Sequence, residues 1–282
     1  MLASHDHHQQ LFIKLENTSG KGIECGYFRI SNHRKVYSHF FENNFASLFR
    51  ELTTLHANDH KNQMMVFIHG MWGNKKRYLH NNIIDFQQCY LDHPSTHLFA
   101  IVWILWEGGH LRYKKNQRCM HSLHDVSKEL LTVLYQIKEN LEATNRKQLN
   151  IHLMAHSMGC MLVNHLSNKD QRILQKPLFK SIILIAPDME LPSEKGQEMA
   201  GMSESIFIFT NRNDFFLKLS QLRNGRKPIG LDMAQNLPHA CHIVNVSEIK
   251  DHTSWIGKVS GHLYFRTSET VKIKIRDILF NR

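Results

Sequence analysis

The sequence predicts an α/β fold with a mostly parallel central sheet and helices on both faces. Short apolar runs alternate with longer amphipathic stretches along the chain, which is the pattern of βαβ units. Some runs, such as residues 64–68 and 98–106, are apolar without interruption, as expected for strands that are covered on both faces. With 42% hydrophobic and 21% charged residues among 282, the chain has the composition and length of one large globular domain.

The core of the sheet is expected to contain the apolar runs at residues 64–68, 98–106, 149–155, 180–186, 205–210 and 242–246. Helices are expected at residues 75–91, 122–144, 158–166 and 268–279. The clearest helical period is that of Val126, Leu130, Leu134, Ile137 and Leu141. Residues 107–118 are polar and basic and are expected to form a loop.

The N-terminal region is expected to complete this sheet. Residues 11–15 and 26–30 have the pattern of antiparallel edge strands, and a helix is expected near residues 44–55. We therefore divide the chain into residues 1–60, which extend the sheet, and residues 61–282, which form the core of a single domain.

The charge and cysteine content limit the class of protein. The formal charge of +10, from 35 Lys and Arg against 25 Asp and Glu, favours anionic partners or surfaces. No zinc-finger spacing, basic heptad region or RNP-like motif is present, so we expect no nucleic-acid partner. The five cysteines are odd in number and scattered, which is typical of a reducing compartment. No leader pattern or apolar run of about 20 residues occurs, so we expect a soluble cytoplasmic protein without an integral membrane segment.

No cofactor or metal is expected. Neither a G-x-G-x-x-G fingerprint nor a phosphate-binding G-x-x-x-x-G-K-[ST] loop follows the first core strand. Histidine is frequent, with 21 residues, but the pairs His121/His124 and His239/His242 lack the supporting ligands and ordered spacing of a zinc site. Solvated or hydrogen-bonded histidine is the simpler interpretation.

The third core run ends in Ala155-His156-Ser157-Met158-Gly159, and a helix is expected to begin at once. This is the nucleophile elbow G-x-S-x-G with alanine in its first position. The turn requires small residues on either side of the serine, because the backbones approach closely there, and Ala155 and Gly159 meet that need. Ser157 is therefore predicted to be a nucleophile at the carboxyl end of the sheet.

A nucleophilic serine needs a base and an acid that orients the base, in the chain order Ser, Asp or Glu, His. Asp188 follows the fourth core strand and Asp214 follows the fifth. The position after the fifth strand favours Asp214 as the acid, with Asp188 as the alternative. For either aspartate, the simpler role is that of a helix N-cap.

The base is expected to be His262, which lies after the sixth core strand and before the closing helix. His252, in a polar loop, and His242, at the start of a strand, are the rivals. The oxyanion hole needs two preorganised N–H donors. We expect one from the backbone of Met158 and the other from Met71, with Trp72 as the second choice.

The motifs together indicate an α/β-hydrolase fold, and the chain resembles a family of mostly bacterial α/β hydrolases that is catalogued as a domain of unknown function. The residues that carry the resemblance are Val66-Phe67-Ile68-His69-Gly70, Ala155-His156-Ser157-Met158-Gly159, Ala186-Pro187-Asp188, Thr210-Asn211-Arg212-Asn213-Asp214, Pro228-Ile229-Gly230 and Gly261-His262-Leu263-Tyr264-Phe265. They span about residues 60–282 in the family's order. The resemblance implies that the acid falls on Asp214 and the base on His262. One departure is Trp106-Glu107-Gly108, where the family often has Trp-Pro-Ser, in a region expected to shape the substrate pocket.

The predicted function is that of a carboxylesterase-like or lipase-like serine hydrolase that forms an acyl-enzyme on Ser157. Residues 189–204 are too few for a large cap domain, so a small cap or none is expected. The substrate is expected to be a small-molecule or lipid ester, and the basic residues 110–115 favour anionic ones. Two alternatives remain: a serine acyltransferase, and a catalytically silent binding or scaffolding protein. The sequence predicts no oligomeric state.

Overall fold

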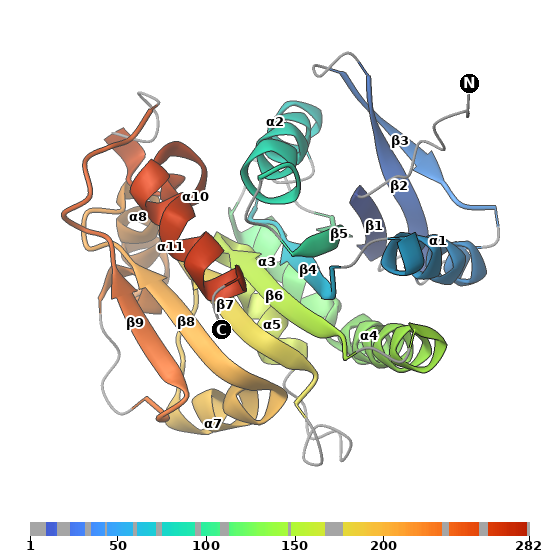
Figure 1. The fold of residues 1–282 in the computed structure, drawn as a ribbon. Helices are drawn as coiled ribbons and strands as arrows, with labels where there is room; N and C mark the ends of the chain where they lie inside the picture. Colours follow the sequence, from blue (N-terminus) through green and yellow to red (C-terminus); the bar gives the residue numbers. More distant parts are fainter. Residues whose placement is uncertain are drawn as a thin grey trace.

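The fold was determined as a computed structural model that describes residues 10–15, 23–31, 35–42, 44–58, 61–71, 75–93, 97–107, 113–145, 148–166, 177–232, 237–253 and 259–280. A nine-stranded sheet forms its centre, in the order β3-β2-β1-β5-β4-β6-β7-β8-β9 (Figure 1). Helices cover both faces of the sheet (Figure 1). This is the predicted α/β-hydrolase architecture, with a mostly parallel sheet and without a large cap among the described residues.

The parallel part of the sheet corresponds to the apolar runs of the sequence. Its strands beyond β1 are β4 (Gln63–Ile68), β5 (Leu98–Trp106), β6 (Asn150–His156), β7 (Phe179–Ile185), β8 (Ser203–Thr210) and β9 (Cys241–Asn245). Every residue of β4 and β5 is buried, as expected for strands with a helical layer on each side. The carboxyl ends of β6, β7 and β8 lie at the same edge, because these strands run parallel.

The N-terminal strands are β1 (Gln10–Leu15), β2 (Ile23–Ser31) and β3 (Lys35–Phe40). The prediction that residues 11–15 and 26–30 form edge strands is wrong. Strand β1 is antiparallel to β2 but parallel to β5, and β2 lies between β1 and β3, so both are inside the sheet and β3 forms the edge. The physical reason is visible in the sequence, since Leu11, Phe12 and Ile13 are consecutive apolar residues that are all buried, as in a strand covered on both faces.

Two hydrophobic layers lie against the sheet. One face is covered by α1 (Asn44–Asn58), α3 (Tyr113–Ser122), α4 (His124–Asn145), α5 (Cys160–Leu166) and α7 (Ser193–Met202). The other face is covered by α2 (Lys76–Phe86) with the π-helical turn η1 (Gln87–Leu91), and by α8 (Phe215–Asn224), α10 (Tyr264–Thr267) and α11 (Glu269–Phe280). The three-residue turns η2 (Ser157–Gly159) and η3 (Ile229–Leu231) complete the described elements.

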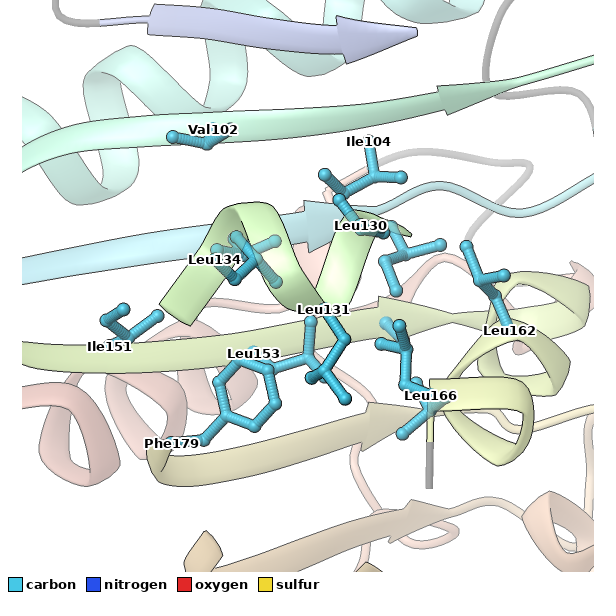
Figure 2. Close-up of a cluster of buried hydrophobic side chains, with 14 of the residues drawn as sticks. Val102, Ile104, Leu130, Leu131, Leu134, Ile151, Leu153, Leu162, Leu166 and Phe179 are labelled. Atoms are coloured by element: carbon cyan, nitrogen blue, oxygen red, sulfur yellow. The ribbon is translucent and has the colours of Figure 1, made fainter. Parts of the chain in front are cut away.

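Helix α4 shows why the sequence pattern was so clear there. Its apolar side chains Leu130, Leu131 and Leu134 point at the sheet and meet Leu153 of β6 and Leu162 of α5 (Figure 2). Leu130 and Leu134 are completely buried. Replacing such a buried leucine by alanine typically lowers the free energy of unfolding by about 2–5 kcal/mol.

The loop predicted at residues 107–118 is partly wrong, because α3 begins at Tyr113. Residues 108–112 of that loop lie outside the described residues. The buried face of α3 contains Asn116 and Met120, both completely buried, with Tyr113 at its start. The spacing is helical, but a tyrosine and an asparagine occupy positions where aliphatic residues would have revealed the helix. The sequence also did not predict α7 or α8.

Candidate active site

Ser157 directly follows β6 as the first residue of η2, and its backbone adopts φ +54°. A serine rarely occupies this left-handed region, so the surrounding structure must hold it there. Close packing supplies that support. A Cβ atom on Gly159 would lie 2.4 Å from the carbonyl oxygen of His69, and one on Gly70 would lie 3.1 Å from Cβ of Ser157. Glycine at position 159 of the motif is therefore required by the contact between the elbow and the loop after β4.

The predicted acid and base are in direct contact. Oδ2 of Asp214 lies 2.6 Å from Nδ1 of His262, and the aspartate is completely buried. Asp214 also caps α8, because its Oδ1 accepts a hydrogen bond of 3.0 Å from the backbone N–H of Leu217. The cap fixes the carboxylate rigidly at the start of the helix, so the two roles that the sequence left open for this residue are compatible.

The segment that carries His262 is held on both sides. Gly261, at φ +57°, accepts a hydrogen bond of 2.7 Å on its carbonyl oxygen from Nδ2 of Asn211. Nε2 of His156 donates to the carbonyl oxygen of His262 at 3.3 Å. Since Nδ1 of the His262 ring is bonded to Asp214, its Nε2 is the nitrogen that remains for another group.

Ser157 and His262 line one cavity at the carboxyl end of the sheet. Met71 and Met158, whose backbone N–H groups are the predicted oxyanion donors, line it as well. The alternative donor, Trp72, lies outside the described residues. The aromatic part of the wall consists of Phe67, Tyr78, Tyr113, Phe216 and Phe265. The cavity is therefore mostly apolar, with a few polar groups converging near the serine.

Asp188, the alternative acid, has different partners. Its Oδ1 accepts from Oγ of Ser220 at 2.6 Å, and its Oδ2 accepts from the hydroxyl of Tyr113 at 2.7 Å. Burial raises the pKa of this carboxyl, while the two hydroxyl donors oppose that shift. Its backbone N–H donates to the carbonyl oxygen of Ser157 at 3.2 Å. Asp188 thus supports the elbow and lines the cavity, but its carboxylate is bonded to hydroxyls, whereas that of Asp214 is bonded to His262.

The two rival histidines contact other residues. Nδ1 of His252 lies 3.0 Å from the hydroxyl of Thr267, in a bridge between residue 252 and Ser268. His242 is exposed and stacks on Phe207, with ring centroids 5.0 Å apart. Neither histidine lines the cavity that contains Ser157.

The loop after β4 is fixed by His69, a residue to which the sequence assigned no separate role. Burial lowers the pKa of its ring to about 4, so the ring is neutral at pH 7. Nε2 accepts from the backbone N–H of Trp106 at 3.3 Å, so the proton is on Nδ1, which donates to the carbonyl oxygen of Gly70 at 2.7 Å. In a trans peptide the N–H points opposite to the C=O. His69 therefore sets the direction of the Met71 N–H.

Several positioning residues were not found from the sequence. This group contains Asn211, Tyr113, Ser220 and Tyr264. The hydroxyl of Tyr264 accepts a hydrogen bond of 2.7 Å from the backbone N–H of Ala186. Asn211 and Tyr264 lie inside motifs that the sequence did single out. The partner of Asn211 is Gly261 and that of Tyr264 is Ala186, which are distant in the sequence, so only the fold brings each pair together.

Within the described ranges, no three His, Cys, Asp or Glu side chains gather in a way that could hold a metal ion. The rings of His121 and His124 each pack edge-on against His165, with centroids 5.8 and 5.4 Å apart. All five cysteines are free thiols. None of the helices in the described part of the chain is both long and apolar enough to cross a bilayer.

The chain belongs to the family described as alpha/beta hydrolases of unknown function (DUF900), which matches residues 45–278. The family resemblance inferred from the motifs is thereby confirmed. Comparison with curated proteins finds no match. Among solved structures, the chain is similar to one titled "m3DLH", with 9% identity, a TM-score of 0.43 and 93% of each chain covered. It is also similar to a structure from a study of two esterases of the fungus Rhizomucor miehei, with 13% identity, a TM-score of 0.47, and 95% of this chain and 83% of that chain covered.

Proposed function

We propose that the protein is a serine hydrolase that cleaves esters through an acyl-enzyme on Ser157. The observation that carries the proposal is the short contact between Asp214 and His262, made beside the same cavity that Ser157 lines. In this arrangement His262 is the general base, and Asp214 holds its ring in the tautomer with the proton on Nδ1.

The reaction then runs in two halves. Oγ of Ser157 bonds to the ester carbonyl carbon as its proton passes to Nε2 of His262, and the carbonyl oxygen becomes an oxyanion. The N–H groups of Met158 and Met71 stabilise that charge. When the intermediate collapses, the carbon–oxygen bond to the alcohol breaks and His262 protonates the alcohol. Water attacks the acyl-enzyme by the same route, releasing the carboxylic acid and restoring the serine hydroxyl.

The cavity favours an ester with an apolar acyl group, because aromatic side chains form much of its wall. Two arginines line it. Arg266 is paired with Asp85 at 2.6 Å, whereas Arg223 has no carboxylate partner among the described residues. An anionic group on the substrate would meet Arg223. Of the basic stretch 110–115, Lys114 and Lys115 are exposed on α3, and residues 110–112 lie outside the described residues.

Labelling with a fluorophosphonate probe tests the proposal directly. The wild-type protein should be labelled, and Ser157→Ala should not. Ser203→Ala is a suitable control, since this buried serine lies at the start of β8, at the opposite end of the strand from Thr210 and the acid loop. A folded wild-type protein that is not labelled would instead support a silent binding or scaffolding role. Product analysis with added alcohols would separate hydrolysis from acyl transfer.

A further inference from the structure

The outer face of α8 has an unusual combination of side chains. Leu222 is 82% exposed and Phe215 is 55% exposed. They are seven residues apart, with Leu219 between them at the helical spacing i+4, so the three side chains form one stripe along the helix. Leu219 is half-buried, so it connects the two exposed side chains. Single exposed apolar residues are normal, but large ones that adjoin along one helix face indicate an interaction site. We call Phe215, Leu219 and Leu222 the α8 ridge.

Cations flank the ridge. Lys218 and Arg223 are exposed, and on a helical projection they lie on opposite sides of the stripe. Neither is paired with a carboxylate among the described residues, whereas Arg226 and Lys227, just beyond the helix, are paired with Glu190 and Asp232. The sequence of α8, FFLKLSQLRN, contains no acidic residue.

The ridge is continuous with the cavity. Leu219 belongs to the ridge and also lines the cavity, as do Phe216 and Arg223 of the same helix. Asp214, which contacts His262, is the N-cap of this helix. Whatever binds the ridge therefore contacts the wall of the cavity that Ser157 also lines.

We propose that the α8 ridge docks the protein on an anionic lipid bilayer. An apolar stripe between cations matches such a surface, where apolar side chains enter the boundary between headgroups and acyl chains and cations approach lipid phosphates. The net charge of +10 adds a long-range attraction to the same surface. If the proposed esterase activity is correct, an ester dissolved in the bilayer would meet the cavity directly. Docking itself does not depend on that activity.

The experiment measures co-sedimentation of the full-length Ser157→Ala protein with vesicles, so that no turnover can change the lipid. The vesicles contain phosphatidylcholine alone or phosphatidylcholine with phosphatidylserine. We expect binding to the mixed vesicles and weak binding to the neutral ones. Phe215→Ser with Leu222→Ser should abolish binding. Lys218→Gln with Arg223→Gln should weaken binding about thirtyfold, since each cation near such a surface contributes about 1 kcal/mol.

A matched control lies on α11, where Ile273 is 47% exposed and the neighbouring Lys274 is exposed. Ile273→Ser with Lys274→Gln makes the same kinds of change elsewhere and should leave binding unchanged. Equal binding by the ridge and control variants would overturn the proposal, as would absence of binding by the parent. Sedimentation velocity without lipid gives another decisive outcome: a dimer that Leu222→Ser dissociates would assign the ridge to a second copy of the chain. Fluorophosphonate labelling in the absence of vesicles tests the esterase proposal separately.

Discussion

At the residue scale, the two aspartates after the parallel strands differ in what they contact. Asp214 reaches His262, whereas Asp188 reaches the hydroxyls of Tyr113 and Ser220. The sequence could place both at strand ends, because each sits in a short motif after an apolar run. It could not choose firmly between them, since the choice depends on where a distant histidine folds back. The same limit explains why Asn211 and His69 were missed as positioning residues.

Substitution of the two aspartates separates their roles. Asp214→Asn keeps a good N-cap but removes the charge that stabilises the His262 imidazolium, so we expect kcat to fall about ten-thousand-fold with little change in stability. Asp188→Asn should reduce kcat much less. Steady-state hydrolysis of a p-nitrophenyl ester, with thermal unfolding as the check on folding, measures both. A larger loss for Asp188→Asn would move the acid to that position.

The direction of the Met71 N–H gives a second prediction at this scale. His69→Phe removes the hydrogen bond that holds the carbonyl of Gly70 while roughly preserving the ring that stacks on Trp106. We expect kcat to fall by about a hundredfold or more, which is typical for loss of one oxyanion donor, with KM changed far less. If a folded variant had an unchanged kcat, the idea that His69 orients the Met71 N–H as an oxyanion donor would be wrong.

At the element scale, the sequence predicted β4 and β5 well because each is a continuous buried run between two helical layers, and β6, β7 and β8 well because most of their residues are apolar and buried. It failed where burial is achieved by other residue types. Helix α3 buries Asn116 and carries Tyr113 to Asp188, so its inward face does not look apolar. Strand β1 differs from the expected edge strand because its continuous apolar run, Leu11 to Ile13, is buried between β2 and β5.

The contact between the elbow and the loop after β4 can be tested with glycines. In Gly159→Ala the new methyl group would lie 2.4 Å from the carbonyl oxygen of His69, so the elbow or the loop must move. We expect loss of fluorophosphonate labelling and a destabilisation of about 1–3 kcal/mol, as for overpacking. Gly225→Ala is the control. Gly225 adopts φ +66°, and a Cβ atom added there would have no neighbour within 4 Å. The substitution should therefore lower the stability by about 1 kcal/mol through backbone strain and leave the labelling intact.

At the scale of the whole molecule, the interior holds several histidines whose pKa is lowered by burial. The pKa is about 4 for His69 and about 3 for His152, and it lies well below the usual value for His156. These rings are neutral in the folded protein, but in the unfolded chain they titrate near 6.5. Between those values the unfolded state binds more protons, so the stability they contribute is complete above pH 6.5 and is lost as the pH falls toward 4.

The prediction is a steep loss of stability in mild acid. For His69 alone, the free energy of unfolding should fall by about 2 kcal/mol between pH 7.5 and pH 5. The pKa of His165 is also lowered to about 4, mainly by burial. The raised pKa of Asp188 acts in the opposite direction, since protonation of that carboxyl favours the folded state, but it is one carboxyl against four histidines. Urea unfolding at both pH values measures the change. His152→Gln keeps a polar group beside Ser181, and its free energy of unfolding should depend less on pH than that of the wild type. An identical pH dependence would show that the pKa of the His152 ring does not change on unfolding.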